Sequence, residues 1–268
     1  MSLRQRTPTA VVLLGATFAV IQYAPDWGFF LFGQVFILAA LLELYKLAER
    51  AGLKPQRALG MVMSFLVSLT FLFRAIPLEA AIYVGLLAAA FYFVISVNTT
   101  EKLTHFPASF AVTVLGMLYL AIPLSFLFWV RMDHGPLYLY FLGGVIFLGD
   151  TGAYFIGKPF GRRKMTPIAS PNKTWEGSAG GILFALGGAI LAWFVLSLPV
   201  PLWRAVLSGL AIHVVAQVSD PLESLFKRAA GVKDSSNFFP GHGGFLDRID
   251  SLILAGPLFY FIVKYFWR

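Results

Sequence analysis

Long apolar runs separated by short polar connections dominate this chain. A membrane-spanning helix needs about 20 mostly apolar residues, and runs of about that length recur along the whole sequence. The runs are unbroken and do not alternate between apolar and polar positions, so they predict helices and not the strands of a membrane barrel. We expect an all-α polytopic membrane protein with nine spans, at 9–24, 27–45, 58–73, 77–97, 106–130, 137–157, 177–198, 201–218 and 249–267.

The composition agrees with this pattern. Of the 268 residues, 58% are hydrophobic and 13% are charged, whereas a soluble domain has about 25% charged residues. The mean hydropathy is +0.76. This excludes a disordered chain and leaves too little charged surface for a soluble fold. Arg4 and Arg6 precede the first run as in a signal peptide, but no small-residue cleavage motif follows before Asp26, so we interpret the run as an uncleaved first helix.

The net charge is +8, and the chain has no cysteine. In a soluble protein such a charge would indicate nucleic acid as a partner. In a membrane protein, basic loops set the orientation and contact anionic headgroups, so we expect no nucleic-acid partner. The lack of cysteine excludes disulfides, thiolate nucleophiles and thiolate metal ligands.

The distribution of Lys and Arg predicts which connections face the cytoplasm. Sixteen basic residues lie in the N-terminal tail and the even-numbered connections, namely Arg4, Arg6, Lys46, Arg50, Lys54, Arg57, Lys102, Lys158, Arg162, Arg163, Lys164, Lys173, Lys227, Arg228, Lys233 and Arg248. Five lie on the other side, namely Arg74, Arg131, Arg204, Lys264 and Arg268. Since cytoplasmic loops are enriched in Lys and Arg, we expect a multi-pass protein of the cell inner (plasma) membrane with a cytoplasmic N-terminus and an outward C-terminus.

Acidic residues concentrate in the second half of the chain. Seven of the 13 acids lie between Asp150 and Asp250, and the two long connections, about 158–176 and 219–248, lie in the same half. The charge distribution places both connections on the cytoplasmic face. We therefore divide the chain into N-terminal helices at 1–136, where we recognise no motif, and a catalytic part at 137–268.

Several of these acids are candidate functional groups. Asp150 lies inside the sixth apolar run, where a carboxylate is costly and usually functional, although it could also bond a neighbouring helix. The eighth run ends with a polar stripe on one helix face, at His213, Gln217 and Asp220.

Two more acids, Asp247 and Asp250, lie one turn apart at the start of the last run, where acids also favour the helix dipole. Several carboxylates near one membrane depth would repel one another unless a cation lay among them. Without cysteine, and with few histidines, the expected ion is Mg²⁺ before Ca²⁺.

The two long connections supply basic residues and glycines. The candidate substrate-binding residues are Ser170, Asn172, Lys173, Thr174, Lys227, Arg228, Lys233, His242, Gly243, Gly244 and Arg248. Orientation of the protein in the membrane would explain the basic residues but not the glycines and acids beside them. Glycine lets backbone N–H groups approach an anion closely. Carboxylates, a hard cation, basic residues and a glycine turn together favour phosphoryl chemistry.

Five stretches of sequence carry a family resemblance: GDTGAY at 149–154, SPNKTWEG at 170–177, SLFKR at 224–228, KD at 233–234 and PGHGGFLDRID at 240–250. Together they resemble the signature of the phosphatidate cytidylyltransferases, also called CDP-diacylglycerol synthases. The stretch SDPLE at 219–223 differs from the Gly-Asp-Leu and Glu-Ser expected there, but it keeps the acids Asp220 and Glu223.

The resemblance implies transfer of a cytidylyl group from CTP to phosphatidic acid, in the bilayer and with the active site toward the cytoplasm. It implies Mg²⁺ on Asp220 and Asp247, with Asp250 either as a further ligand or just outside the ligand set. It also implies catalytic roles for Asp220, Asp247, Asp150 and Lys173. The basic loop residues would then bind phosphates. The oligomeric state stays open, a homodimer included.

Two alternatives stay open at this point. A related enzyme could use an isoprenoid-type lipid phosphate as acceptor, or could use CTP to phosphorylate a polyprenol. An ion or proton transporter could use Asp150 and Asp220 as a relay. A transporter predicts matching broken helices in two halves of the chain, whereas the polar residues here lie mainly in one half.

Overall fold

The computed structural model describes residues 3–239, 241 and 243–268, with side chains from Leu13 onward. Most of these residues are helical. The α-helices are α1 (Leu3–Tyr23), α2 (Asp26–Arg50), α3 (Arg57–Leu72), α4 (Leu78–Ser96), α5 (Thr100–Gly116), α6 (Ile122–His134), α7 (Pro136–Phe160), α8 (Trp175–Val195), α9 (Leu202–Ala229) and α10 (Leu246–Phe261). Two π-helical segments, η1 (Met117–Ala121) and η2 (Ile262–Phe266), follow α5 and α10.

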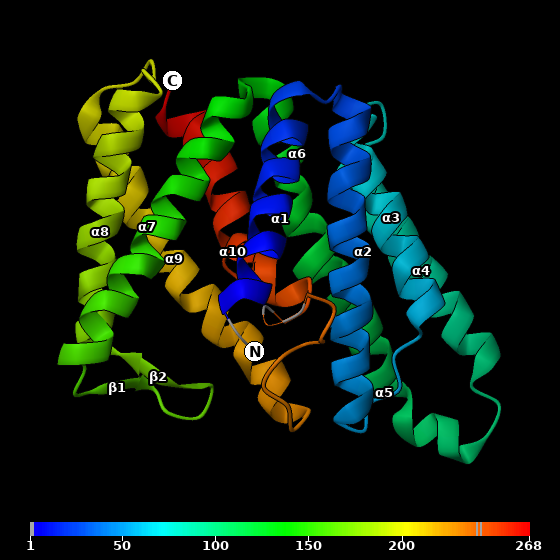
Figure 1. Cartoon of the computed structure of the whole chain (residues 1–268). Coiled ribbons are helices and arrows are strands. Elements are labelled where there is room, and N and C mark those ends of the chain that lie inside the picture. Colours follow the sequence, from blue (N-terminus) through cyan, green and yellow to red (C-terminus); the bar gives the residue numbers. More distant parts are fainter. Residues whose placement is uncertain (1–2, 240, 242) are drawn as a thin grey trace. The chain divides into compact units, whose positions relative to one another are not determined.

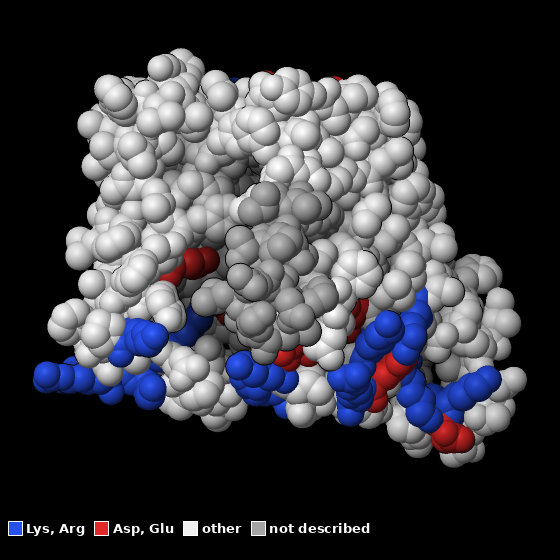
Figure 2. Space-filling model, viewed as in Figure 1, with Lys and Arg blue, Asp and Glu red and all other residues white. Residues whose placement is uncertain are grey.

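Seven of the described helical segments are long and apolar enough to cross a membrane. They are α2, α4, the continuous helix Thr100–His134, α7, α8, α9 and the helix Leu246–Phe266, whereas α3 and the apolar part Leu13–Tyr23 of α1 are shorter. Figure 2 shows broad surface without any charged side chain, as expected for lipid-facing helices. The polytopic helical architecture is therefore confirmed, while the count of nine spans and their orientation remain predictions.

Contacts divide the chain into two compact units that alternate along the sequence. Unit 1 comprises Met1–Phe128 and Phe226–Arg248, and unit 2 comprises Trp129–Leu225 and Ile249–Arg268. The division that we made at residue 136 concerns motifs and not contacts, so it remains a prediction.

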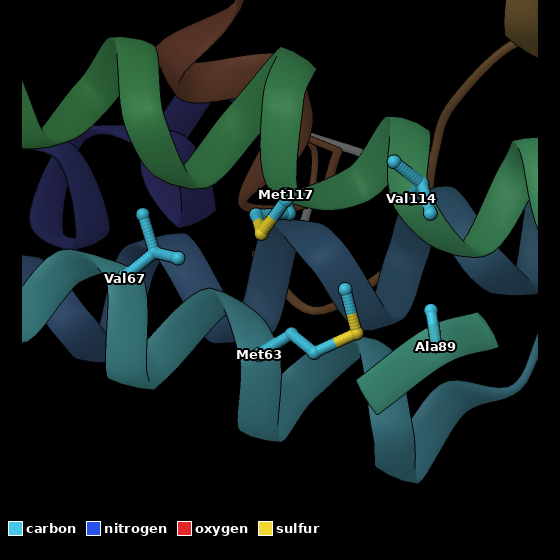
Figure 3. Close-up of a cluster of buried hydrophobic side chains, with 5 residues drawn as sticks. All are labelled: Met63, Val67, Ala89, Val114 and Met117. Atoms are coloured by element: carbon cyan, nitrogen blue, oxygen red, sulfur yellow. The ribbon is translucent and has the colours of Figure 1, made fainter. Parts of the chain in front are cut away.

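Unit 1 has a compact apolar core between its helices. Met63 and Val67 of α3, Ala89 of α4, Val114 of α5 and Met117 of η1 are all buried there. Figure 3 shows these five side chains between their ribbons. Apolar burial of this kind stabilises the packing of α3, α4 and α5.

Tyr45 fixes α2 within unit 1. Its side chain is fully buried, and its hydroxyl donates to the backbone oxygen of Thr113 at 2.7 Å. The ring fits because two facing residues are glycines: a Cβ built on Gly60 or Gly116 would lie 2.0 or 2.4 Å from the Tyr45 oxygen. These contacts fix α2 against α3 and α5.

Unit 2 is built on the antiparallel pair α7 and α8 (Figure 1). Glycines bring the two helices together, since a Cβ on Gly152 would lie 2.4 Å from Phe184 and one on Gly180 would lie 2.5 Å from Ile156. Such close backbone approach through small residues is typical of packed membrane helices.

A short antiparallel hairpin joins α7 to α8, in a connection for which no strand was predicted (Figure 1). Its strands are β1 (Lys164–Thr166) and β2 (Ser170–Thr174), with Lys164 opposite Thr174 and Thr166 opposite Ser170. In the second long connection, α9 continues through Pro221 to Ala229, beyond the membrane span expected at 201–218. Hydropathy marks only the apolar part of a helix. A polar extension continues the internal hydrogen bonds except at Pro221, which has no backbone N–H.

Candidate active site

Unit 2 contains a cavity of about 670 Å³ beside the hairpin. Its polar lining comes from α7, the hairpin, α8 and α9: Asp150, Tyr154, Lys158, Lys164, Asn172, Lys173, Thr174, Ser178, Gln217 and Asp220. Cavities of about 300–1,000 Å³ are the usual size for small-molecule and cofactor sites. A charged small molecule such as a nucleotide therefore suits both the size and the lining.

An ion pair between Lys173 and Asp220 lies in this cavity. The Lys173 Nζ is 2.6 Å from Asp220 Oδ2, and the two side chains are 27% and 33% exposed. The Asp150 carboxylate also interacts electrostatically with both groups, attracted by Lys173 and repelled by Asp220. One ammonium group thus compensates part of the charge of two carboxylates. Three of the four predicted catalytic residues line the same cavity.

The N-terminus of α8 closes one side of the cavity. The Thr174 hydroxyl caps this helix by accepting from the backbone N–H of Gly177 at 3.1 Å. Glu176 accepts from the backbone N–H groups of Arg162 and Arg163 at 3.0 and 3.2 Å, which holds the start of the hairpin. We predicted Thr174 as a substrate ligand and did not single out Glu176, although an acid in the first turn of a helix is a recognisable signal.

A polar network extends from the cavity wall into the interior of unit 2. Ser178 donates its hydroxyl to Gln217 Oε1, and Gln217 Nε2 donates to the backbone oxygen of Ser178 at 3.0 Å and to His213 Nε2 at 2.8 Å. His213 is fully buried. Gly149 and Gly181 make room for its ring, because a Cβ on either would lie within about 2.5 Å of a ring nitrogen. The predicted polar stripe therefore lines the cavity at Gln217, while His213 is enclosed.

The loop between α9 and α10 surrounds Asp247 in unit 1. Asp247 Oδ1 accepts from Lys227 Nζ at 2.6 Å. Asp247 Oδ2 accepts from the backbone N–H and the hydroxyl of Ser235, at 2.9 and 2.6 Å, and from the backbone N–H of Gly244 at 2.8 Å. Gly243 adopts a φ of +76°, which favours glycine. The segment 230–246, which we call the signature loop, thus holds the Asp247 carboxylate through its described residues.

The other predicted residues lie in α9, the hairpin, the loop after α9 and α10. Arg228 donates to the backbone oxygen of Val232 at 3.1 Å, Asp250 Oδ1 accepts from the Ser251 N–H at 2.7 Å, and Ser170 accepts from the Thr166 hydroxyl within the hairpin. Three side chains are exposed, those of Asn172, Lys233 and Arg248. His242 lies outside the described residues.

The oxygen groups of the cavity fit a hard cation. Mg²⁺ is usually held by one or two carboxylates, with water and substrate phosphates completing its octahedron, and Asp150 and Asp220 supply two carboxylates on one cavity. Within the described part of the chain, no three acidic or imidazole side chains gather closely enough to hold an ion by themselves. Mg²⁺ shared with a phosphate ligand therefore fits, and the predicted set Asp220, Asp247 and Asp250 remains a prediction.

Comparison with known proteins shows the family to which this chain belongs. The sequence profile of the cytidylyltransferase family matches residues 4–266. The chain belongs to this family. Relatives named phosphatidate cytidylyltransferase include one from Bacillus subtilis, which is 46% identical over half of each chain. One from Staphylococcus epidermidis is 32% identical over 83% of this chain and 86% of its own, and one from Staphylococcus haemolyticus is 32% identical over 96% and 97%.

Membership of the cytidylyltransferase family extends to the N-terminal helices, where we recognised no motif. An acidic residue of that region that contacts the signature loop was missed. Glu43 of α2 is buried and accepts hydrogen bonds from Ser235, Ser236, Phe245 and Leu246, all within unit 1. An acid inside the second apolar run was a signal that could have identified it.

Proposed function

We propose that this protein transfers a cytidylyl group from CTP to phosphatidic acid, giving CDP-diacylglycerol and pyrophosphate. The observation that carries the proposal is the cavity with the Lys173–Asp220 ion pair and Asp150. It occurs in a chain of the cytidylyltransferase family whose relatives bear the name of this activity.

The reaction requires little covalent chemistry from the protein. A phosphate oxygen of the lipid attacks the α-phosphorus of CTP, the new P–O bond forms, and the bond to the β-phosphate oxygen breaks to release pyrophosphate. Phosphate is already a nucleophile at neutral pH, so no enzyme intermediate is needed. Positioning and charge neutralisation then account for most of the catalysis.

Lys173 is proposed to bind the triphosphate. Before substrate binds, its pairing with Asp220 holds the ammonium in the cavity and neutralises part of the acidic charge. An incoming phosphate would compete with Asp220 for Lys173, which frees the Asp220 carboxylate. The basic residues in and beside the signature loop are proposed to contact substrate phosphates, namely Lys227, Arg228, Lys233 and Arg248.

Asp220 and Asp247, with Asp250 as a further ligand, are proposed to hold Mg²⁺, while Asp150 orients the cation or Lys173. Mg²⁺ supplies neutralisation of the triphosphate charge when it is bound. The oxygen-rich lining of the cavity supports this choice of ion.

The location is proposed from the same features. The membrane-spanning helices and the bacterial relatives support a multi-pass protein of the plasma membrane. An active site on the cytoplasmic face would meet CTP from the cytoplasm and the lipid acceptor from the bilayer.

One incubation tests the proposal. Purified protein is mixed with CTP, Mg²⁺ and phosphatidic acid, and pyrophosphate and CDP-diacylglycerol are measured. Matched reactions contain a polyprenyl phosphate or a polyprenol as the acceptor. Product formed only with phosphatidic acid supports the proposal. If product forms only with an isoprenoid acceptor, that acceptor and not phosphatidic acid is the substrate. If no acceptor gives product, the assigned reaction is wrong.

A further inference from the structure

Glu43 of α2 is a buried carboxylate held by one distant segment of unit 1. Its side chain is 5% exposed. It accepts from the hydroxyls of Ser235 and Ser236 at 2.9 and 2.6 Å, and from the backbone N–H groups of Phe245 and Leu246 at 3.1 and 2.8 Å. All four donors are neutral and belong to the signature loop, about 200 residues away in sequence.

The backbone donors explain why a charged group is stable there. Phe245 and Leu246 lie at the start of α10, where the first N–H groups of a helix have no partner within the helix. The helix dipole also favours a negative charge at this end. Glu43 therefore caps α10 from another helix.

The loop backbone packs directly on the Glu43 carboxylate. A Cβ built on Gly244 would lie 2.4 Å from both carboxylate oxygens and 2.3 Å from the Ser235 hydroxyl. Seven residues before Glu43 on the same helix, the ring of Phe36 meets the ring of Phe245 edge-on, with centroids 5.2 Å apart. A polar and an aromatic contact thus hold the same end of the loop to α2.

Ser235 links Glu43 to Asp247. Its hydroxyl oxygen is 2.9 Å from Glu43 Oε2 and 2.6 Å from Asp247 Oδ2. A hydroxyl has one proton, so it can donate to only one of the two carboxylates at a time. A displacement of either carboxylate therefore changes the hydrogen bonding of the other.

We propose that Glu43 is a positioning residue, which fixes the loop from Ser235 to Leu246 and, through Ser235, the carboxylate of Asp247. The proposal rests on the proposed function in one respect, the role of Asp247 in it. A purely structural role for Glu43 in α2 is less consistent with its contacts. Tyr45 already fixes that helix, and within the described part of the chain every hydrogen bond of the Glu43 side chain goes to the loop.

The test compares Glu43→Gln, Glu43→Asp and Glu49→Gln. The Gln variant keeps the shape, but its NH₂ group cannot accept from N–H donors. Glu49→Gln is the control. It removes a charge from the same helix, but the Glu49 carboxylate pairs with Arg57 and not with the loop. Because the native chain has no cysteine, a spin label on Asn237→Cys, an exposed loop position, reports loop mobility in each variant.

We expect Glu43→Gln to lower kcat by about tenfold or more, as for the loss of buried hydrogen bonds to a charged group, and to make the label more mobile. Glu43→Asp keeps the charge and should recover part of both. Glu49→Gln should leave kcat within about twofold and the label spectrum unchanged. The unfolding temperature of each variant separates loop positioning from general destabilisation, since a structural role would make activity follow that temperature.

An unchanged label spectrum with normal kcat in Glu43→Gln would overturn the proposal, and so would activity that simply follows unfolding temperature. Should that variant fail to fold, Ser236→Ala removes one donor without touching α2 and must still raise label mobility. The label needs no turnover. If the wild-type protein showed no cytidylyl transfer, the proposed function would be wrong. The label spectra would still show whether Glu43 positions the loop.

Discussion

Lys173 is the basic group that the unit 2 cavity holds against a carboxylate. Lys173→Ala should lower kcat/KM by about ten- to a hundredfold, because a charge-assisted contact to a phosphate contributes about 1.5–3 kcal/mol. Lys54→Ala is the control, since its partner is the exposed Glu101 and a surface ion pair contributes little. Steady-state rates at varied CTP provide the measurement. Unchanged turnover and CTP affinity would mean that Lys173 only orients the protein in the membrane.

The acids make a second prediction at the same scale. Asp220→Asn or Asp247→Asn keeps the shape but removes the charge and one oxygen ligand, so either should nearly abolish activity, with little rescue by added Mg²⁺. Asp250→Asn should cost less. If these acids served only the helix dipole, the variants would lose about 0.3–1 kcal/mol of stability and keep the Mg²⁺ requirement. Rates measured against Mg²⁺ for the wild type and all three variants distinguish the two, and near-normal rates for Asp247→Asn would refute the metal assignment.

The residues of the site were predictable to different degrees. Asp150 and Asp220 were identifiable because an acid in or beside an apolar run is costly, and Lys173 because polar residues surround it. The structure brings all three to one cavity. Glu43 carries the same signal and was missed. Its partners were not predictable, because they lie about 200 residues away and a single sequence shows no sign of so distant a contact.

Among the elements, the α7–α8 pair depends on its glycines. Gly180→Ala should destabilise the protein by about 1–3 kcal/mol, the usual cost of overpacking, since the new Cβ would lie 2.5 Å from Ile156. Gly187→Ala in the same helix is the matched control, because among the described residues nothing beyond its own stretch of helix lies within 4 Å of its Cβ position. That variant should be neutral or slightly stabilising, as alanine favours helix. Thermal unfolding of both variants in one detergent measures the difference, and equal unfolding temperatures would contradict the packing.

Helices were predictable from hydropathy, but the hairpin was not. In a bilayer every backbone N–H and C=O must find an internal partner, so a long apolar run has to be a helix. The strands β1 and β2 are three and five residues long and polar. They are too short for an alternating pattern, and Glu176 holds the start of the hairpin from the next helix. The end of α9 at Ala229 lies beyond the expected span, because the last turns of the helix are polar and hydropathy does not mark them.

For the whole molecule, the strongest untested feature is the orientation in the membrane. Sixteen basic residues are predicted on one side and five on the other, and merging or splitting a single span would mix the two groups. Seven described helices are long and apolar enough to cross the membrane, and two shorter ones lie at Leu13–Tyr23 and Arg57–Leu72. Whether the two shorter helices also cross decides the number of spans. An odd number of spans places the two termini on opposite sides.

Single cysteines decide this, because the native chain offers no background labelling. Lys102, Arg163, Lys233 and Arg268 are all exposed in the structure, so a membrane-impermeant maleimide can reach a cysteine at each one from its own side. With nine spans, the first three should react only in inside-out vesicles and Arg268→Cys only in right-side-out ones. Reaction at every position after permeabilisation controls for accessibility. If Arg163→Cys and Arg268→Cys reacted from the same face, an even number of spans would lie between the two positions. The predicted outward C-terminus would then be wrong.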